Sequence, residues 1–317
     1  MIQKILNYMK KGDVKTLQTD AIDYTKILRS AGISPVLTDV GSSGTSHGIW
    51  EPIASESLLI GFDPDTRNPN KTFGKGYSRN ILVNKAVSPD DMVDTINFVL
   101  TEYPSCSSTL EPDMESLSSF SFRDYFRPVS RVDVAATSIN RVMGDEGLEA
   151  IHWIKLDSQG IDLRLLKSIQ DKYFDRLLAV DIEPGLVRAY QEEDLFTNCH
   201  SWLIEHGFWM SRLEYQAYPK IRPDTLAEMA QRKGLDPQVM MRRLPKAPTA
   251  VEGRYLREIN WLAKSGRDGR ALILAGIFGL LDGQNGYAYD VASLYIDRFG
   301  KDNSAEELMT AALADND

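Results

Sequence analysis

The sequence predicts an α/β fold built on a doubly wound, mostly parallel sheet. Short apolar runs of the kind that become buried strands recur between residues 35 and 182, and segments with helical spacing separate several of them. A glycine-rich turn follows the first of these runs. Because strands that alternate with helices form parallel sheets with both faces covered, we expect one large sheet of the nucleotide-binding type.

The expected elements can be placed in chain order. A helical pattern covers residues 17–30, and Gly32 and Pro35 mark the change to a strand. Buried strands are predicted at residues 35–40, 57–62, 81–87, 151–157 and 177–182. Helices are predicted at residues 46–55, 161–173 and 195–206. An aromatic strand over residues 208–217 is expected to end the sheet.

Two regions depart from the βα alternation. Residues 94–101 and 130–137 alternate apolar and polar side chains, which indicates half-exposed strands in an insertion near the mouth of the site. After residue 222, helical patterns recur at residues 255–263, 270–281 and 291–299. We therefore divide the chain into an N-terminal helical segment (1–30), a sheet domain (31–222) and a helical C-terminal appendage (223–317).

Composition narrows the function classes. With 43% hydrophobic residues, the 317-residue chain can bury a sizeable core, and a net charge of -9 disfavours binding to nucleic acid. Cys106 and Cys199 lack metal-site or disulfide-scaffold spacing, and the N-terminus lacks the pattern of a secretory signal, so we expect a cytoplasmic protein. The apolar stretch 271–281 is too short for a membrane span. No histidine cluster suggests a metal site, although a magnesium-assisted reaction stays open.

The strongest local signal is the turn Asp39-Val-Gly41-Ser-Ser-Gly44, between the first strand and the first helix. Glycines there permit a sharp bend and let a ligand approach backbone N–H groups. Asp39 occupies the first glycine position of a dinucleotide-binding GxGxxG motif. A carboxylate repels a pyrophosphate and attracts an ammonium group, so S-adenosylmethionine is favoured over NAD. The alternative is a glycine-rich turn that binds nothing.

Acidic side chains follow two further strands. Asp63 lies 24 residues after Asp39, at the end of the second strand, where an acidic residue can accept hydrogen bonds from ribose hydroxyls. In Lys155-Leu-Asp157-Ser-Gln159, Asp157 and Gln159 should face the same crevice as Asp39 and Asp63, and Lys155 shares one strand face with Asp157. The alternative is that Lys155 and Asp157 form a structural ion pair, and Asp162 is expected to cap the next helix.

With these segments the chain resembles the FkbM family of S-adenosylmethionine-dependent methyltransferases. The resemblance covers residues 31–222 and rests on Asp39-Val-Gly41-Ser-Ser-Gly44, Phe62-Asp63-Pro64, Asn84-Lys-Ala86-Val-Ser88, Ser107-Ser108, Lys155-Leu-Asp157-Ser-Gln159-Gly160, Val180-Asp-Ile-Glu183-Pro and Glu193-Asp194-Leu-Phe196. It implies a Rossmann-like methyltransferase sheet and transfer of a methyl group to a hydroxyl, on a sugar or polyketide-like small molecule.

The resemblance and the motifs together assign roles to individual residues. The cofactor S-adenosylmethionine is expected to contact Asp39, Gly41, Ser42, Gly44, Asp63, Ala86 and Ser108. Asp157 is the expected general base with Lys155 as its electrostatic partner, while Gln159, Glu183 and His47 are expected near the acceptor. His47 and His152 are alternative bases, although His152, near the start of its strand, is expected to be structural.

Two positions depart from the family pattern, which commonly has glutamate where this chain has Asp63 and Gln159. Asp63 keeps the carboxylate with a shorter reach, whereas Gln159 removes a negative charge near the site of methyl transfer. Two other functions therefore stay open: a catalytically silent methyltransferase-like domain that binds a partner, and an NAD-dependent oxidoreductase. A homo-oligomer is compatible with each of them.

Overall fold

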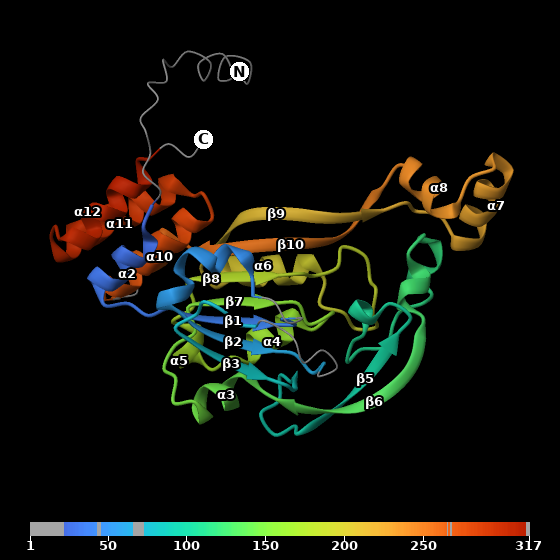
Figure 1. Ribbon diagram of the computed structural model, residues 1–317, viewed down its shortest axis with the longest axis horizontal. Coiled ribbons are helices and arrows are strands. Elements are labelled where there is room, and N and C mark those ends of the chain that lie inside the picture. The colour runs from blue at the N-terminus through green and yellow to red at the C-terminus, as the bar shows by residue number, and fades with distance from the viewer. Residues whose placement is uncertain (1–21, 43–45, 66–72, 265, 267, 315–317) are drawn as a thin grey trace, which may run out of the picture.

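A central seven-stranded sheet organises the computed structural model (Figure 1), which describes residues 22–42, 46–65, 73–264, 266 and 268–314. The strand order is β3-β2-β1-β7-β8-β10-β9. Its parallel strands are β1 (Val36–Val40), β2 (Leu58–Phe62), β3 (Arg79–Val83), β7 (Trp153–Leu156) and β8 (Ala179–Ile182). The fold class is therefore the expected Rossmann-like, mostly parallel α/β sheet.

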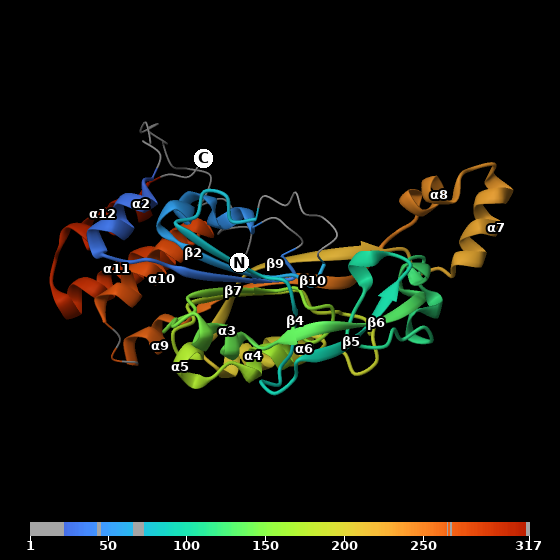
Figure 2. The ribbon, with the colours of Figure 1, turned by 60° about the horizontal axis from the view of Figure 1, so that its bottom comes forward.

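Both faces of the sheet are covered, because side chains alternate along each strand. Leu37 of β1 belongs to a core shared with α2 (Tyr24–Ala31), α10 (Gly269–Leu281), α11 (Asn285–Phe299) and α12 (Asn303–Ala312). Val40 belongs to a second core on the other face, shared with α3 (Ile139–Asp145), α4 (Asp162–Ser168), α5 (Asp171–Phe174) and α6 (Phe196–Glu205). The two helical layers lie on opposite sides in Figure 2.

The chain reverses its direction of travel across the sheet at β1. From β1 the order runs outward through β2 to β3, and it then returns to place β7 on the other side of β1. Such a topological switch point leaves a crevice at the carboxyl ends of the two strands, which is where open α/β sheets bind ligands. The fold therefore locates the candidate site at the ends of β1 and β7.

The insertion near this edge forms a separate small sheet. Its strands are β4 (Ala86–Val87), β5 (Thr95–Thr101) and β6 (Pro128–Thr137), in the order β4-β6-β5. Figures 1 and 2 place it beyond the carboxyl ends of the parallel strands, as the alternating pattern predicted. The expected strand 81–87 is divided between the two sheets, since only its first part lies in β3.

Some expected helices differ in detail. The pattern at residues 46–55 forms the 3₁₀ helix η1 (Gly48–Glu56), in which Pro52 lacks a backbone N–H donor. The pattern at residues 161–173 is divided between α4 and α5. The predicted helix 17–30 corresponds to α2, which begins at Tyr24 after the N-cap residue Asp23, and residues 1–21 lie outside the described residues.

The expectation that the sheet ends at β9 (Phe208–Tyr218), followed by an entirely helical appendage, is wrong. Strand β10 (Ala247–Arg257) returns from the appendage and inserts between β8 and β9, antiparallel to both. Tyr255 packs in one core and Leu256 in the other, so burial on both faces favours a strand over the expected helix at 255–263. Only α9 (Ile259–Lys264) forms there.

The remaining helices of the appendage form two groups. Helices α7 (Pro223–Lys233) and α8 (Pro237–Arg243) lie at the far end of the β9–β10 hairpin (Figure 1) and share a small apolar cluster around Leu226, Ala230 and Met240. Helices α10 to α12 pack on the sheet at its opposite end. Within the described part of the chain, no helix has the length and apolar character needed to cross a membrane.

Candidate functional site

The turn after β1 brings two strand ends into contact. Gly41 has φ +81°, and an added Cβ would collide with the backbone carbonyl oxygen of Asp157 after β7. The backbone N–H groups of Gly41 and Ser42 both donate to the Phe62 carbonyl oxygen, at 3.0 and 3.2 Å. These two amides therefore join β1 to β2 instead of facing a ligand. Gly44 lies outside the described residues.

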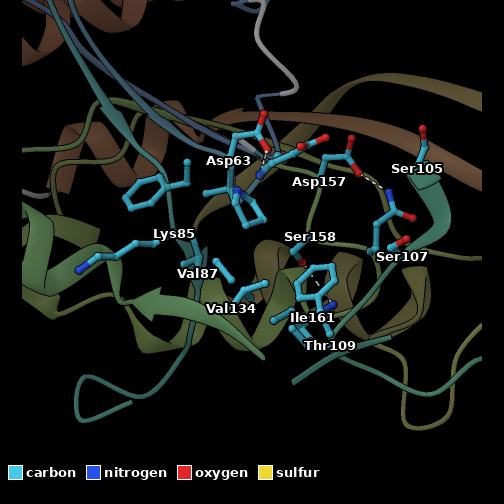
Figure 3. Close-up of a pocket in the computed structure, with 18 of the residues that line it drawn as sticks. Asp63, Lys85, Val87, Ser105, Ser107, Thr109, Val134, Asp157, Ser158 and Ile161 are labelled. Atoms are coloured by element: carbon cyan, nitrogen blue, oxygen red, sulfur yellow. Dashed lines mark hydrogen bonds between the residues drawn. The ribbon is translucent and has the colours of Figure 1, made fainter. Parts of the chain in front are cut away.

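A cavity of about 640 Å³ opens at this edge of the sheet (Figure 3). Of the residues expected to bind the cofactor, Gly41, Asp63 and Ala86 line it, together with Asp157 and Gln159. The small sheet supplies an apolar wall that includes Phe98, Leu100, Val132 and Val134. Its size is in the range of small-molecule and cofactor sites, which occupy roughly 300–1,000 Å³.

The acidic side chain at the end of β2 faces this cavity. Asp63 is buried, and its Oδ1 accepts a hydrogen bond of 2.8 Å from the backbone N–H of Asp65. This bond fixes the carboxylate at the cavity wall, where Figure 3 shows it among the lining side chains. A carboxylate held in this way can accept hydrogen bonds from ligand hydroxyls.

Asp39 and Ser42 do not line the cavity. Both are buried, and Asp39 Oδ1 and Ser42 Oγ have no hydrogen-bond partner among the described residues. Burial raises the pKa of Asp39 to about 6, although the nearby charges of Lys155 and His47 oppose this shift. An unpaired polar atom in a protein interior is costly, so these two atoms mark a place that a ligand or water would satisfy.

Ser108 does not line the cavity. It is fully buried, and its hydroxyl donates 2.6 Å to the Gln159 carbonyl oxygen while accepting from the Leu110 N–H. Its role in the structure is to fasten the insertion to the loop after β7. The neighbouring Ser107 lines the cavity instead.

The amide of Gln159 holds Asp157 in place. Gln159 Nε2 donates 2.6 Å to Asp157 Oδ1, and Tyr190 Oη donates 3.1 Å to Gln159 Oε1. Gln159 has φ +57°, a conformation rarely adopted by non-glycine residues. A carboxylate at position 159 could not donate this hydrogen bond, so the departure from glutamate gives Asp157 a neutral donor.

Lys155 connects two carboxylates. Its Nζ lies 3.0 Å from Glu183 Oε1 and 3.6 Å from Asp157 Oδ2, as the shared strand face predicted for Asp157. Burial lowers the pKa of Lys155, but Glu183, Asp157 and Asp39 together raise it above its ordinary value. Burial, and then the charge of Asp157, raise the pKa of Glu183 to about 7. Lys155 is therefore held as a cation, and the raised pKa of Glu183 lies near neutrality.

A second cavity, of about 380 Å³, lies on the Glu183 side of Lys155. Its wall is strongly charged and includes Lys155, Asp181, Glu183, Arg212, Glu214, Glu252 and Arg254. His47 also lines it, with Nε2 3.0 Å from Arg254 Nη2 and 3.2 Å from Asp181 Oδ2. The cluster of Lys155 with Asp157 and Glu183 thus joins the two cavities.

Buried polar contacts hold this cluster in position. Arg254 bridges Asp181 and Asp282, with both contacts at 2.7 Å. Asp162 is the first residue of α4 and not the expected cap: its Oδ2 accepts 3.0 Å from the Glu183 N–H, and its Oδ1 accepts from the Ser158 N–H. Asp162 thereby connects the backbone after β7 to the backbone after β8. His152 is structural, since its Nδ1 accepts 2.9 Å from the Val36 N–H.

Sequence reasoning missed Asp181, Arg254 and Tyr190. Asp181 could have been found, because it lies two residues before Glu183 on a strand whose side chains alternate. Arg254 lies on β10, which the sequence did not predict. Among the described residues, no group of three or more His, Cys, Asp or Glu side chains is arranged to hold a metal ion.

Comparisons with known proteins identify the family. The family model described as "Methyltransferase FkbM domain" matches residues 53–210, which include β2, β7, β8 and the insertion. A comparison with curated proteins gives no match. One solved structure, described as "Structure of an antibiotic related Methyltransferase", is 14% identical and has a TM-score of 0.23, covering 76% of this chain and 97% of that chain; that score is too low to support an argument. On the family match, the chain belongs to the FkbM methyltransferases.

Proposed function

We propose that this methyltransferase uses S-adenosylmethionine and methylates a hydroxyl group of a small molecule. The observation that carries the proposal is the 640 Å³ cavity at the switch point, which Gly41, Asp63 and Asp157 line together. The catalytic unit would comprise residues 31–222 together with β10, because β10 supplies Arg254 to the wall of the second cavity.

The residues around the first cavity fit this cofactor. Asp63 can accept hydrogen bonds from the ribose hydroxyls, and the apolar wall from β5 and β6 can pack against the adenine ring. The unsatisfied Asp39 Oδ1 and Ser42 Oγ favour a polar, positively charged group such as the amino-acid portion. When bound, S-adenosylmethionine supplies a methyl group activated for nucleophilic attack. Ala86 contributes to the wall, whereas Ser108 acts from behind it.

We place the acceptor in the second cavity, next to Glu183 and His47. Its charged wall favours a polar, sugar-like acceptor over an apolar polyketide-like one, because burying that wall against apolar groups would leave charges desolvated. The acceptor hydroxyl must then reach past the cluster around Lys155 to the methyl group, because in-line displacement requires direct contact between the reacting atoms.

We assign the proton acceptor to Glu183, in place of the Asp157 that the sequence favoured. A general base works best with a pKa near the working pH, and the pKa of Glu183 is raised to about 7. Asp157 is fixed by Gln159 Nε2 and raises the pKa of Glu183 through its charge. Lys155 holds both carboxylates and stabilises their charge as the proton is transferred.

The direct test is transfer of tritiated methyl groups from S-adenosylmethionine to a panel of acceptors. The panel pairs methyl glycosides of hexoses, deoxyhexoses and aminosugars with apolar alcohols and phenols of similar size. The proposal predicts transfer to members of the sugar set, with the label recovered as a methyl ether. Transfer only to the apolar set would contradict the acceptor assignment, and transfer to neither set would support the silent binding domain.

A further inference from the structure

The outer edge of strand β9 is open over its second half. β9 ends the seven-stranded sheet, and no strand in the described residues pairs with its other side. Residues 212–216 are exposed, and among them Leu213 and Tyr215 retain 50% and 65% of their accessible surface. A long edge strand with exposed apolar side chains is a ready template for pairing with another chain. At the opposite edge, β3 is shorter, with only five residues.

Charges of like sign meet where β9 pairs with β10. Arg212 lies opposite Arg254, and Glu214 lies opposite Glu252. Like charges placed directly opposite each other destabilise a strand pair. Arg212 and Glu214 compensate by pairing along their own strand, with Nε 2.7 Å from Oε1, but both side chains remain more than half exposed, at 58% and 53%. A neighbouring strand that offered the opposite charges would complement the exposed Arg212 and Glu214.

We propose that β9 pairs antiparallel with β9 of a second copy of this chain, on a two-fold axis at Leu213. Antiparallel pairing centred on Leu213 places Arg212 opposite Glu214 of the partner subunit and Glu214 opposite Arg212 of the partner subunit. The arginine pair of Arg254 and Arg212 is thereby followed by a glutamate on the partner strand, and the glutamate pair of Glu252 and Glu214 by an arginine. The pairing also brings the two Leu213 side chains together and joins the two sheets.

This interface bears on the second cavity. Arg212 and Glu214 line that cavity, so the partner subunit contributes charged side chains next to its wall. The first half of β9 is less available for pairing, because Gln284 Nε2 donates 3.1 Å to the Ser211 carbonyl oxygen. The dimer does not depend on the proposed methyl transfer, since its evidence lies in the sheet edge and its charges.

The mass of the full-length protein in solution tests the proposal. Light scattering after gel filtration should give twice the chain mass of 35.6 kDa. Leu213→Lys should return the mass to that of one chain, because it places two ammonium groups on the axis. The matched control is Val129→Lys, which changes an equally apolar strand residue with 63% exposure and should leave the dimer intact. A monomeric wild-type protein, or a dimer that survives Leu213→Lys, would overturn the proposal.

Charge reversal tests the register. Arg212→Glu and Glu214→Arg should each raise the dimer dissociation constant at least about tenfold, because each creates like-charge pairs across the axis. The double variant restores opposite charges and should recover the wild-type constant within about threefold. A Leu213→Cys variant should oxidise to a covalent dimer, since paired strand residues lie within disulfide range. Failure of the double variant to recover, or of the cysteine pair to form, would contradict this register.

Discussion

The ammonium group of Lys155 lies 3.0 Å from the carboxylate of Glu183, at the boundary between the two cavities. The same nitrogen is 3.6 Å from Asp157, which faces the larger cavity. One largely buried cation therefore holds two carboxylates from the ends of neighbouring parallel strands. Several consequences of this arrangement can be measured.

Replacing Glu183 should change how turnover depends on pH. Burial and Asp157 raise its pKa from 4.5 to about 7, so a basic Glu183 accumulates as the pH rises through 7. We expect wild-type kcat/KM to rise between about pH 6 and 8 and then level off. Glu183→Gln should lose this limb and lower kcat by about 10²–10⁴-fold.

The pH profile of Asp157→Asn distinguishes the two candidate bases. If Glu183 is the base, kcat/KM of this variant still rises with pH. The rise moves to lower pH, because the charge of Asp157 that raises the pKa of Glu183 is gone. If the rise of kcat/KM with pH disappeared in Asp157→Asn but persisted in Glu183→Gln, Asp157 would be the general base. Unchanged binding of S-adenosylhomocysteine by both variants would confirm that the cofactor cavity is intact.

Removing the cation should destabilise the protein. Lys155→Met leaves Asp157 and Glu183 without their shared cation. Because all three side chains are partly exposed, we expect a cost of about 3 kcal/mol, the lower end of the range for buried ion pairs. Urea denaturation measures this loss. Lys301→Met removes an exposed pair with Glu306 and should cost less than about 1 kcal/mol. Equal losses in the two variants would contradict the structural importance of Lys155.

Gly41→Ala should be more damaging than backbone strain alone explains. Gly41 and Gly76 both have positive φ, +81° and +92°, but only at Gly41 would an added Cβ collide with the backbone of Asp157. We expect Gly76→Ala to cost about 1–2 kcal/mol of unfolding free energy. Gly41→Ala should cost at least about 1 kcal/mol more and weaken binding of S-adenosylhomocysteine. Similar values for both variants would show that the close approach can relax.

Asp63→Ala should weaken cofactor binding without unfolding the protein. A hydrogen bond to a charged group contributes about 1.5–3 kcal/mol, so the dissociation constant of S-adenosylhomocysteine should rise roughly 10- to 100-fold. Glu149→Ala, which removes an exposed acidic side chain away from the cavity, is the matched control. An affinity equal to that of the control would remove Asp63 from the cofactor site.

Much of the fold and of the first cavity could be predicted from local pattern. Buried parallel strands are apolar along their length, and their carboxyl ends lie at one edge of the sheet. The sequence alone therefore predicts that Gly41, Asp63 and Asp157 lie close together, as they do in the first cavity. Ser108 was placed one residue away from the side chain that faces the cavity. A shift of one residue reverses the face of an extended segment, and sequence alone does not resolve it.

The second cavity could not be derived in the same way. Four of the seven Asp, Glu, Lys and Arg residues in its wall come from β9 and β10. β10 follows two helices that separate it from its partner strand β9 in sequence. The apolar residues of β10 are buried on both faces of the sheet, so their spacing does not distinguish a strand from a helix. Because the predicted sheet ended at β9, Arg254 could not be predicted as a residue of the site.

Binding of the cofactor is the most direct test of the central claim. Isothermal titration of the purified protein with S-adenosylhomocysteine, S-adenosylmethionine and NAD in parallel should give saturable binding of the first two and none of NAD. That result would support the assignment of the larger cavity to the methyl donor. A folded protein that binds NAD instead, or that binds none of the three, would contradict it.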